Sequence, residues 1–358
     1  MYQRPRRRTS TVASARRRWI RSIDKTADMA LTASFRGAIA ILAMVVLVAT
    51  GCETDPPEAA PSSPFPGSIL QRMLAEDAEE HNAGVIALVE TDGAAWQGAA
   101  GDYQGKREAD PGDLFDIGST GKTYLATVVL QLVEEGSLSL DDSVEQWLPG
   151  EVEGDRRVLI RHLLNHTSGL TVSPSGDITL TAEPGTRYGY STLEYGLLGN
   201  IVSEVTGRRP GQEVRDRILV PLGLENTWLT VKDASGHWLG VREGNCAFCL
   251  PATPGGISTT SDLARFFQAL LAGELLGPDM MAELKRMVPT GTEIQAGLGV
   301  FRFDLPCGTA WGHGGEFTYY SNQVLVSDDG SQALVVARNA RDWYSIKTLA
   351  EEMYCQAF

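Results

Sequence analysis

The sequence predicts an α+β fold, because strand-like segments lie near both ends of its folded region and helix-like segments fill the middle. The folded region begins near Gly67 and continues to Phe358. This length is enough for one large domain or for two closely packed ones. We see no internal repeat, so a repeat architecture is not predicted.

The strand-like segments are short runs rich in β-branched and apolar residues, with turn residues at their ends. The first two are predicted to form a hairpin around the turn Thr91-Asp92-Gly93. The five segments are residues 84–90, 94–101, 297–303, 318–326 and 331–338.

The helix-like segments carry apolar residues at intervals of three and four. The first begins after Gly118 and ends at Gly136, which places Ser119 at a helix N-terminus. The others are residues 158–223, which include loops, residues 261–273 and residues 345–355.

The segment before the folded region is predicted to be an export signal followed by a tether. Residues 38–49 form an apolar run too short to span a bilayer, and the run ends just before Cys52. Residues 1–51 therefore resemble a bacterial lipoprotein signal, in which Met29 would be the start of a compact signal. The alternative is a long basic extension with an uncleaved anchor. Residues 52–66 contain five prolines among Ser, Ala and Glu, which predicts a disordered tether.

This interpretation predicts the location of the protein. We expect export, lipidation at Cys52 and anchoring to the cell membrane or to an outer membrane. The folded region would then face the periplasm or the exterior.

Acidic residues outnumber basic ones along the chain. There are 31 Lys and Arg against 45 Asp and Glu, which gives a net charge of −14. Residues 1–51 hold ten of the basic residues and two of the acidic ones, so the remainder carries 21 and 43, a net charge of −22. This balance argues against nucleic acid and anionic lipid headgroups as partners.

Four cysteines follow Cys52, an even number in a compartment that favours disulfides. We expect two pairs, Cys246 with Cys249 and Cys307 with Cys355. The C-x-x-C pair is also half of a possible metal site, but no second pair follows at finger spacing. Of the histidines, His237 alone is near it in the sequence. No metal is therefore predicted.

Residues 117–123 read Ile-Gly-Ser-Thr-Gly-Lys-Thr and fit two motifs. A P-loop needs glycine at position 116, where the chain has Asp116, and an exported domain meets little ATP. The motif S-x-x-K instead places Ser119 three residues before Lys122 on one face of a helix. We favour S-x-x-K and keep a nucleotide-binding protein as the alternative.

The chemistry of S-x-x-K suits a nucleophile and its base. Backbone N–H groups at a helix N-terminus favour negative charge that develops near Ser119. Lys122 lies in an otherwise apolar stretch, where desolvation lowers the pKa of an amine. A neutral Lys122 can take the proton from Ser119.

Further motifs are spaced widely along the chain. They are residues 115–122, residues 163–170 (Leu-Leu-Asn-His-Thr-Ser-Gly-Leu), Tyr190-Ser191, residues 221–224 (Pro-Leu-Gly-Leu), residues 255–264, and residues 312–315 (Gly-His-Gly-Gly). In this order they resemble the class C β-lactamase and D-alanyl-D-alanine carboxypeptidase superfamily of penicillin-binding serine hydrolases. Family VIII esterases and D-aminopeptidases belong to it too. The resemblance implies an antiparallel sheet flanked by helices, with an all-helical region inserted at about residues 125–290.

The resemblance also implies roles for the residues of the site. Ser119 corresponds to the acylated nucleophile, Lys122 to the adjacent base or proton shuttle, and Tyr190 to the tyrosine of a Y-x-N motif. A cationic Lys122 is expected to lower the pKa of Tyr190, and which of the two is the base stays open. The backbone N–H groups of Ser119 and Glu316 would form the oxyanion hole.

The third motif contains His313 and Gly315, on a strand that would line the substrate cleft. Gly315 would let substrate approach the backbone closely, and His313 would donate to a substrate carboxylate or to Tyr190. His166 is expected to be structural. One residue departs from the family pattern, because Thr192 replaces the asparagine of Y-x-N and lacks its reach to a substrate carbonyl.

The sequence therefore predicts a serine hydrolase that forms an acyl-enzyme and uses no cofactor. Ester or amide bonds of small acyl or D-amino-acid peptide substrates are expected, and a peptidoglycan-derived peptide fits the predicted location. A β-lactamase is one alternative. A catalytically inactive binding scaffold is another, with Thr192 as its support.

Overall fold

A computed structural model describes residues 64–103, 105–152, 157–172, 178–229, 231–232, 238–239, 255–317 and 319–358. The predicted signal, nearly all of the predicted tether, Cys52 and the predicted pair Cys246–Cys249 lie outside these residues. Within the described residues, no helix is long and apolar enough to cross a membrane.

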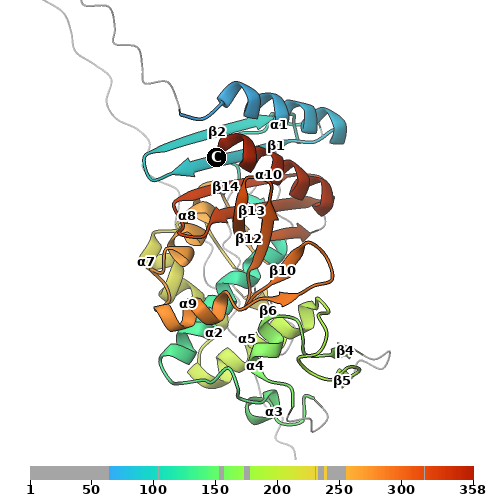
Figure 1. Cartoon of the computed structure of the whole chain (residues 1–358), viewed down its shortest axis with the longest axis vertical. Helices are drawn as coiled ribbons and strands as arrows, with labels where there is room; N and C mark the ends of the chain where they lie inside the picture. The colour runs from blue at the N-terminus through green and yellow to red at the C-terminus, as the bar shows by residue number, and fades with distance from the viewer. Residues whose placement is uncertain are drawn as a thin grey trace, which may run out of the picture. The chain divides into compact units, whose positions relative to one another are not determined.

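An eight-stranded antiparallel sheet forms the centre of the fold, in the order β2-β1-β14-β13-β12-β11-β10-β9. Strand β1 pairs on one side with β2 and on the other with β14, so both ends of the folded region build one sheet (Figure 1). The strands are β1 (Val85–Thr91), β2 (Ala94–Ala100), β9 (Val288–Pro289), β10 (Ile294–Ala296), β11 (Phe301–Leu305), β12 (Gly308–Phe317), β13 (Tyr320–Ser327) and β14 (Gln332–Arg338).

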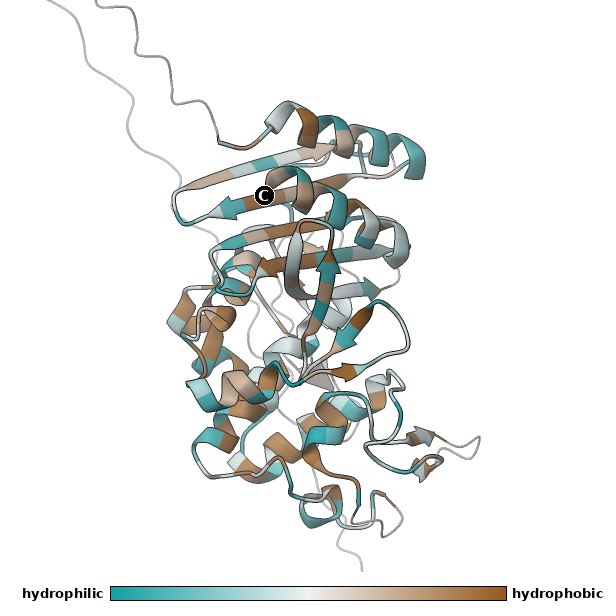
Figure 2. Cartoon of the chain, in the orientation of Figure 1, coloured by the Kyte–Doolittle hydropathy of each residue, from teal (hydrophilic) through white to brown (hydrophobic). Residues whose placement is uncertain are grey.

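Alternating side chains of the sheet enter two separate cores, as the two-residue period of a strand requires. Along β1, Val85, Ala87 and Val89 pack on one face of the sheet with helices α1 (Gly67–His81) and α10 (Trp343–Ala357). Ile86 and Leu88 face the other side and join the larger core. Figure 2 shows hydrophobic residues along the central strands that these cores cover.

A mostly helical region lies between β2 and β9 in the sequence and packs below the sheet in Figure 1. Helix α2 is largely buried, and its Tyr124 ring stacks on Phe266 of α8 at 3.6 Å between centroids. The helices are α2 (Gly121–Glu134), α3 (Val144–Trp147), α4 (Ile160–Leu164), α5 (Thr192–Thr206), α6 (Pro210–Val214), α7 (Val220–Leu222), α8 (Thr260–Leu271) and α9 (Pro278–Leu284).

Short elements complete this region. A 3-10 turn, η1 (Gly118–Thr120), precedes α2, and a π-helical turn, η2 (Arg215–Leu219), joins α6 to α7. The two-stranded pairs are β3 (Phe115–Asp116) with β8 (Ile257–Ser258), β4 (Leu170–Val172) with β5 (Ile178–Leu180), and β6 (Val231–Lys232) with β7 (Trp238–Leu239).

The α+β prediction is confirmed, and so is the opening hairpin. The strand predicted at residues 297–303 is partly wrong, because Gly297 donates its N–H to Val300 and Gly299 has a φ of +92°, so a turn separates β10 from β11. Strand β12 and helix α1 were not among the segments predicted from local pattern.

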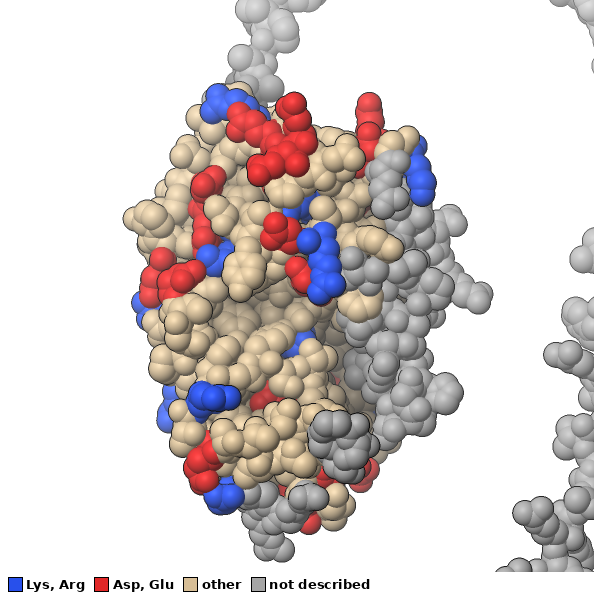
Figure 3. Space-filling view, turned by 90° about the vertical axis from the view of Figure 1, so that its right-hand side faces the viewer, with Lys and Arg blue, Asp and Glu red and all other residues tan. Residues whose placement is uncertain are grey.

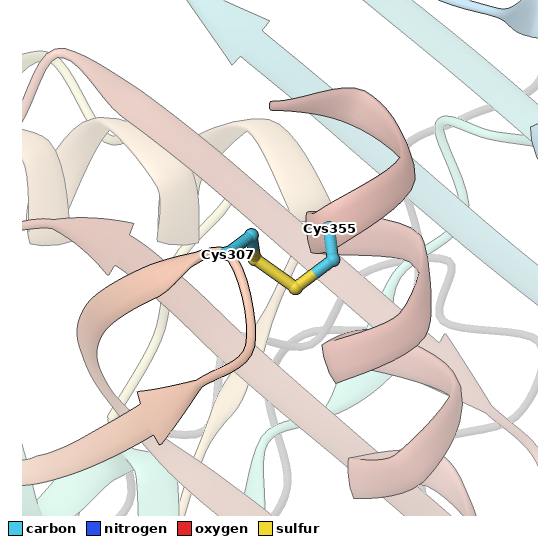
Figure 4. Close-up of a disulfide and its surroundings, with 2 residues drawn as sticks. All are labelled: Cys307 and Cys355. Atoms are coloured by element: carbon cyan, nitrogen blue, oxygen red, sulfur yellow. A yellow bond between two sulfur atoms is a disulfide. The ribbon is translucent and has the colours of Figure 1, made fainter.

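A disulfide joins Cys307, in the turn between β11 and β12, to Cys355 near the end of α10 (Figure 4). This is one of the two predicted pairs. It ties the last helix to the hairpin that contains β12.

Candidate active site

The predicted nucleophile lies on a turn that packs directly against strand β12. Gly118, with a φ of +48°, starts the turn, and a Cβ there would lie 2.9 Å from the backbone nitrogen of Glu316. A Cβ on Gly315 would lie 2.0 Å from the carbonyl oxygen of Ile117. Because these distances are too short for any side chain, glycine at both positions allows β12 to pass beside Ser119.

Two hydrogen bonds hold the turn in place. The N–H of Gly118 donates to Oδ1 of buried Asp116 at 2.9 Å. Asp116, which stands where a P-loop would have glycine, therefore stabilises the turn. Thr120 donates its hydroxyl to Oδ1 of Asn322 on β13 at 2.7 Å. The serine turn is thus held by β3 before Ser119 and by strand β13 of the sheet after it.

Ser119 and Lys122 are in contact. Nζ of Lys122 lies 2.9 Å from Oγ of Ser119, one helical turn away. Burial lowers the pKa of Lys122 to about 8, although the negative charge of Glu194 opposes this shift. About a tenth of the lysine is therefore a neutral amine at pH 7, and this form can accept the serine proton.

Tyr190 lies on the other side of the lysine, with its ring centroid 5.1 Å from Nζ of Lys122. The residue as a whole is 43% exposed and lines the cleft. Burial of the phenol group raises the pKa of Tyr190 to about 12, although a hydrogen bond with Ser119 opposes this shift. The pKa of Tyr190 is therefore raised rather than lowered as expected, and burial is the largest cause.

His313 is buried on β12 with its ring 4.9 Å from that of Phe301. Burial and the nearby charge of Lys122 lower its pKa to about 3, so the ring is neutral. Nδ1 lies 2.6 Å from the carbonyl oxygen of Gly314. Because a carbonyl accepts and cannot donate, Nδ1 carries the proton and Nε2 is an acceptor. The expectation that His313 donates to a substrate is therefore corrected.

The residues form one wall of a cleft of about 530 Å³. Figure 3 shows this side of the molecule hollowed, with mainly uncharged residues around the hollow. Aromatic side chains predominate in the lining, which comes from several elements. It comprises Ser119, Tyr188, Tyr190, Thr290, Thr292, Glu293, Ile294, Phe301, His313, Gly314, Glu316, Trp343, Tyr344 and Lys347.

The structure brings most of the predicted site together. Ser119, Lys122 and Tyr190 are in contact, while His313 and Glu316 line the same cleft. Thr192 does not enter it, because this residue is exposed on the first turn of α5 and is not among the lining residues.

The carboxylate of Glu316 points toward the start of α10. It accepts from Nε of Arg341 at 2.7 Å and from the N–H of Trp343 at 3.0 Å. These bonds fix the strand end whose backbone N–H was predicted as an oxyanion donor.

Several site residues were missed by sequence reasoning. Trp343, Tyr344 and Phe301 line the cleft from α10 and β11, and Glu194 lies buried behind Lys122. No local motif marks them, because each reaches the site through long-range packing. Glu194 had one signal, an acidic residue beside the apolar run of residues 195–198 in α5, four residues after Tyr190.

Comparisons with known proteins agree with this geometry. The β-lactamase family model matches residues 70–349. Penicillin-binding protein 4 of Amycolatopsis lactamdurans is 33% identical over 187 residues, which are 46% of this chain and 49% of that protein. The match thus spans about half the length of that relative. A β-lactamase of Lysobacter lactamgenus is 28% identical over 300 residues, and the match covers 76% of this chain and 74% of that protein.

Among solved structures, the D-stereospecific amidohydrolase from Streptomyces sp. has a TM-score of 0.63 and 30% sequence identity, and the match covers 80% of this chain and 98% of that chain. The predicted β-lactamase/transpeptidase-like fold is confirmed. Because the family match includes residues 117–123, these residues are the S-x-x-K motif and the P-loop interpretation is wrong. The chain belongs to the β-lactamase family of serine hydrolases.

Proposed function

We propose that this protein hydrolyses ester or amide bonds of small acyl or D-amino-acid peptide substrates through an acyl-enzyme on Ser119. The observation that carries the proposal is the 2.9 Å contact between Oγ of Ser119 and a desolvated Lys122 at the edge of an open cleft. An unactivated serine is a poor nucleophile, and a positioned base contributes about 10²- to 10⁴-fold to the rate.

In the acylation step, the neutral amine of Lys122 takes the proton of Ser119. Oγ then attacks the substrate carbonyl carbon, and the carbonyl oxygen becomes an oxyanion beside the backbone N–H groups of Ser119 and Glu316. When the tetrahedral intermediate collapses, the bond to the leaving group breaks and that group receives the proton from Lys122. A water molecule then repeats the sequence on the acyl-enzyme and releases the acid.

Lys122 is a better candidate for the base than Tyr190. Its pKa of about 8 gives a populated base form near neutral pH, whereas the pKa of Tyr190, about 12, leaves the phenol protonated. The neutral phenol, hydrogen-bonded with Ser119, is suited to pass a proton to the leaving group.

The polar groups of the cleft favour a substrate that offers hydrogen-bond donors. His313 has an acceptor nitrogen left after its bond to Gly314. The ammonium of Lys347 is already paired with Glu351 at 2.8 Å and with Glu293 at 3.4 Å. A D-amino-acid amide or ester, with its ammonium or N–H, therefore suits the cleft better than a peptide that ends in a free carboxylate. The similar Streptomyces amidohydrolase is described as D-stereospecific.

A stereochemical assay tests this function. The soluble domain would be given D- and L-amino-acid p-nitroanilides, simple nitrophenyl esters and a penicillin, with Ser119→Ala as the control. Hydrolysis of D-amino-acid or ester substrates that is lost in Ser119→Ala supports the proposal. Turnover of the penicillin alone would favour a β-lactamase, and no turnover of any substrate would favour an inactive scaffold.

We further propose that the chain is exported and anchored through a lipid on Cys52. The support is the sequence alone: a short apolar run ends before Cys52, and a Pro-rich stretch follows. Membrane fractionation of the full chain and of Cys52→Ala tests this. Recovery of both in the same fraction would contradict it.

A further inference from the structure

A buried carboxyl group lies behind the serine–lysine pair and has no part in the mechanism above. Glu194, on the first turn of α5, is 1% exposed. Oγ of Ser168 donates to its Oε1, and its Oε2 is in contact with Nδ1 of His166. The group therefore joins α5 to the loop that follows α4.

The backbone donor that faces His166 favours a proton on Glu194. The backbone N–H of Ser191 points at Nδ1 of His166 at 3.3 Å, so this nitrogen is an acceptor. The contact between Nδ1 and Oε2 of Glu194 then needs its hydrogen on the carboxyl group. The electrostatics agree, because burial raises the pKa of Glu194 to about 8 and lowers that of His166 to about 3.

The acid is connected to both partners of the nucleophile. The His166 ring that it holds lies 4.4 Å from the ring of Tyr190 and 5.4 Å from that of Tyr195. Lys122 lies 5.1 and 5.8 Å above the same two tyrosine rings. A negative charge on Glu194 raises the pKa of Lys122 and so favours its ammonium form.

The titratable groups around this cluster are few among the described residues, and burial keeps all but one of them uncharged. The tyrosines at 188, 190 and 195 have raised pKa values, and His313 has a lowered one. Lys122 is the cationic group whose charge lowers the pKa of Glu194, against the larger effect of burial. The charge of Lys122 is thus set first by burial and second by the charge state of Glu194.

We propose that Glu194 is a positioning residue for the nucleophile: as a neutral acid near pH 7 it fixes the His166 ring against Tyr190 and leaves the amine of Lys122 available as a base. When Glu194 ionises at higher pH, its carboxylate favours the ammonium form of Lys122. The inference rests on the proposed serine hydrolase function. It assigns a role to a side chain that does not touch the substrate.

Glutamine is the diagnostic substitution, because its amide can replace a neutral acid but not a carboxylate. In Glu194→Gln, the side-chain N–H can donate to Nδ1 of His166 while the oxygen accepts from Ser168. In Glu194→Ala, both partners lose their bond. Glu204→Gln is the matched control, since Glu204 is an exposed residue of the same helix.

The experiment measures the pH dependence of two Ser119 reactions in the full folded domain: hydrolysis of a nitrophenyl ester and labelling by a fluorophosphonate. We expect Glu194→Gln to keep kcat/KM within about threefold of wild type at pH 7. Its rise with pH should move to lower pH, because no carboxylate then forms to stabilise the ammonium of Lys122. Glu194→Ala should lose about tenfold or more, and Glu204→Gln should match wild type.

Loss of activity in Glu194→Gln equal to that in Glu194→Ala, with both variants folded by thermal unfolding, would overturn the proposal, since a carboxylate would then be required. An unchanged pH profile in Glu194→Gln would overturn it as well. Absence of labelling in wild type, or equal labelling of Ser119→Ala, would instead remove the proposed function, and the inference with it.

Discussion

Replacing Gly315 by alanine tests how closely β12 must lie against the serine turn. The new Cβ would lie 2.0 Å from the carbonyl oxygen of Ile117 and 2.5 Å from Nδ2 of Asn322. An ordinary contact begins at 3.4 Å, so the strand or the turn must move by about 1.4 Å. The closest atom belongs to the backbone, which cannot turn away as a flexible side chain can.

Two effects of different size are expected from this shift. Overpacking costs about 1–3 kcal/mol of folding free energy. If the Glu316 N–H is an oxyanion donor, as proposed, its misplacement relative to Ser119 should lower kcat by about 10²- to 10³-fold. A protein that loses this much folding free energy can still be mostly folded. The expected fall in kcat is therefore much larger than the loss of folded protein would cause.

The assay is steady-state hydrolysis of a nitrophenyl ester, together with thermal unfolding of the same preparations. Gly93→Ala is the control, because a Cβ at Gly93 meets nothing within 4 Å. We expect wild-type kcat in the control and a strongly reduced kcat in Gly315→Ala. Wild-type kcat in Gly315→Ala would refute the close approach of β12 as a requirement for catalysis.

Three further predictions follow from other contacts. Lys122→Met should lower kcat/KM by about 10²- to 10⁴-fold, and wild-type kcat/KM should rise with pH through about 8 as Lys122 loses its proton; a flat profile would contradict this. Asp77→Ala leaves the buried Arg338 guanidinium, now 2.6 Å from Asp77, without its ion-pair partner. The urea midpoint should fall by the equivalent of about 3–5 kcal/mol, and an unchanged midpoint would show that the pair adds nothing. Cys355→Ala removes the disulfide that closes a separation of 48 residues. The variant should be about 4 kcal/mol less stable than oxidised wild type on the chain-entropy model, and reduced wild type in the same unfolding assay is the control. Equal stability of oxidised wild type and the variant would contradict this.

Local sequence pattern was enough to predict the features of this fold that depend on residues close together in the sequence. The β-rich run at residues 84–90 and the turn Thr91-Asp92-Gly93 predicted the first hairpin, and the i, i+3 spacing of Ser119 and Lys122 predicted their contact. Both features depend on neighbours in sequence, and the structure shows the hairpin and the 2.9 Å contact.

Features set by packing could not be predicted in this way. Tyr190 has a raised pKa because of its burial, which no single sequence position records. Nε2 of His313 is an acceptor because Nδ1 bonds to Gly314, a detail of backbone geometry. Glu194 and His166 are 28 residues apart and meet only when α5 packs on the loop after α4.

Intact-mass spectrometry can detect the acyl-enzyme that we propose on Ser119. The domain from Gly67 onward would be incubated with a penicillin and, separately, with a slowly hydrolysed D-amino-acid ester, beside the Ser119→Ala variant. If Ser119 is acylated, we expect an adduct of one equivalent on the wild type. Peptide mapping should locate it at Ser119, and the variant should lack it. No adduct with either reagent, or an equal adduct on Ser119→Ala, would contradict it.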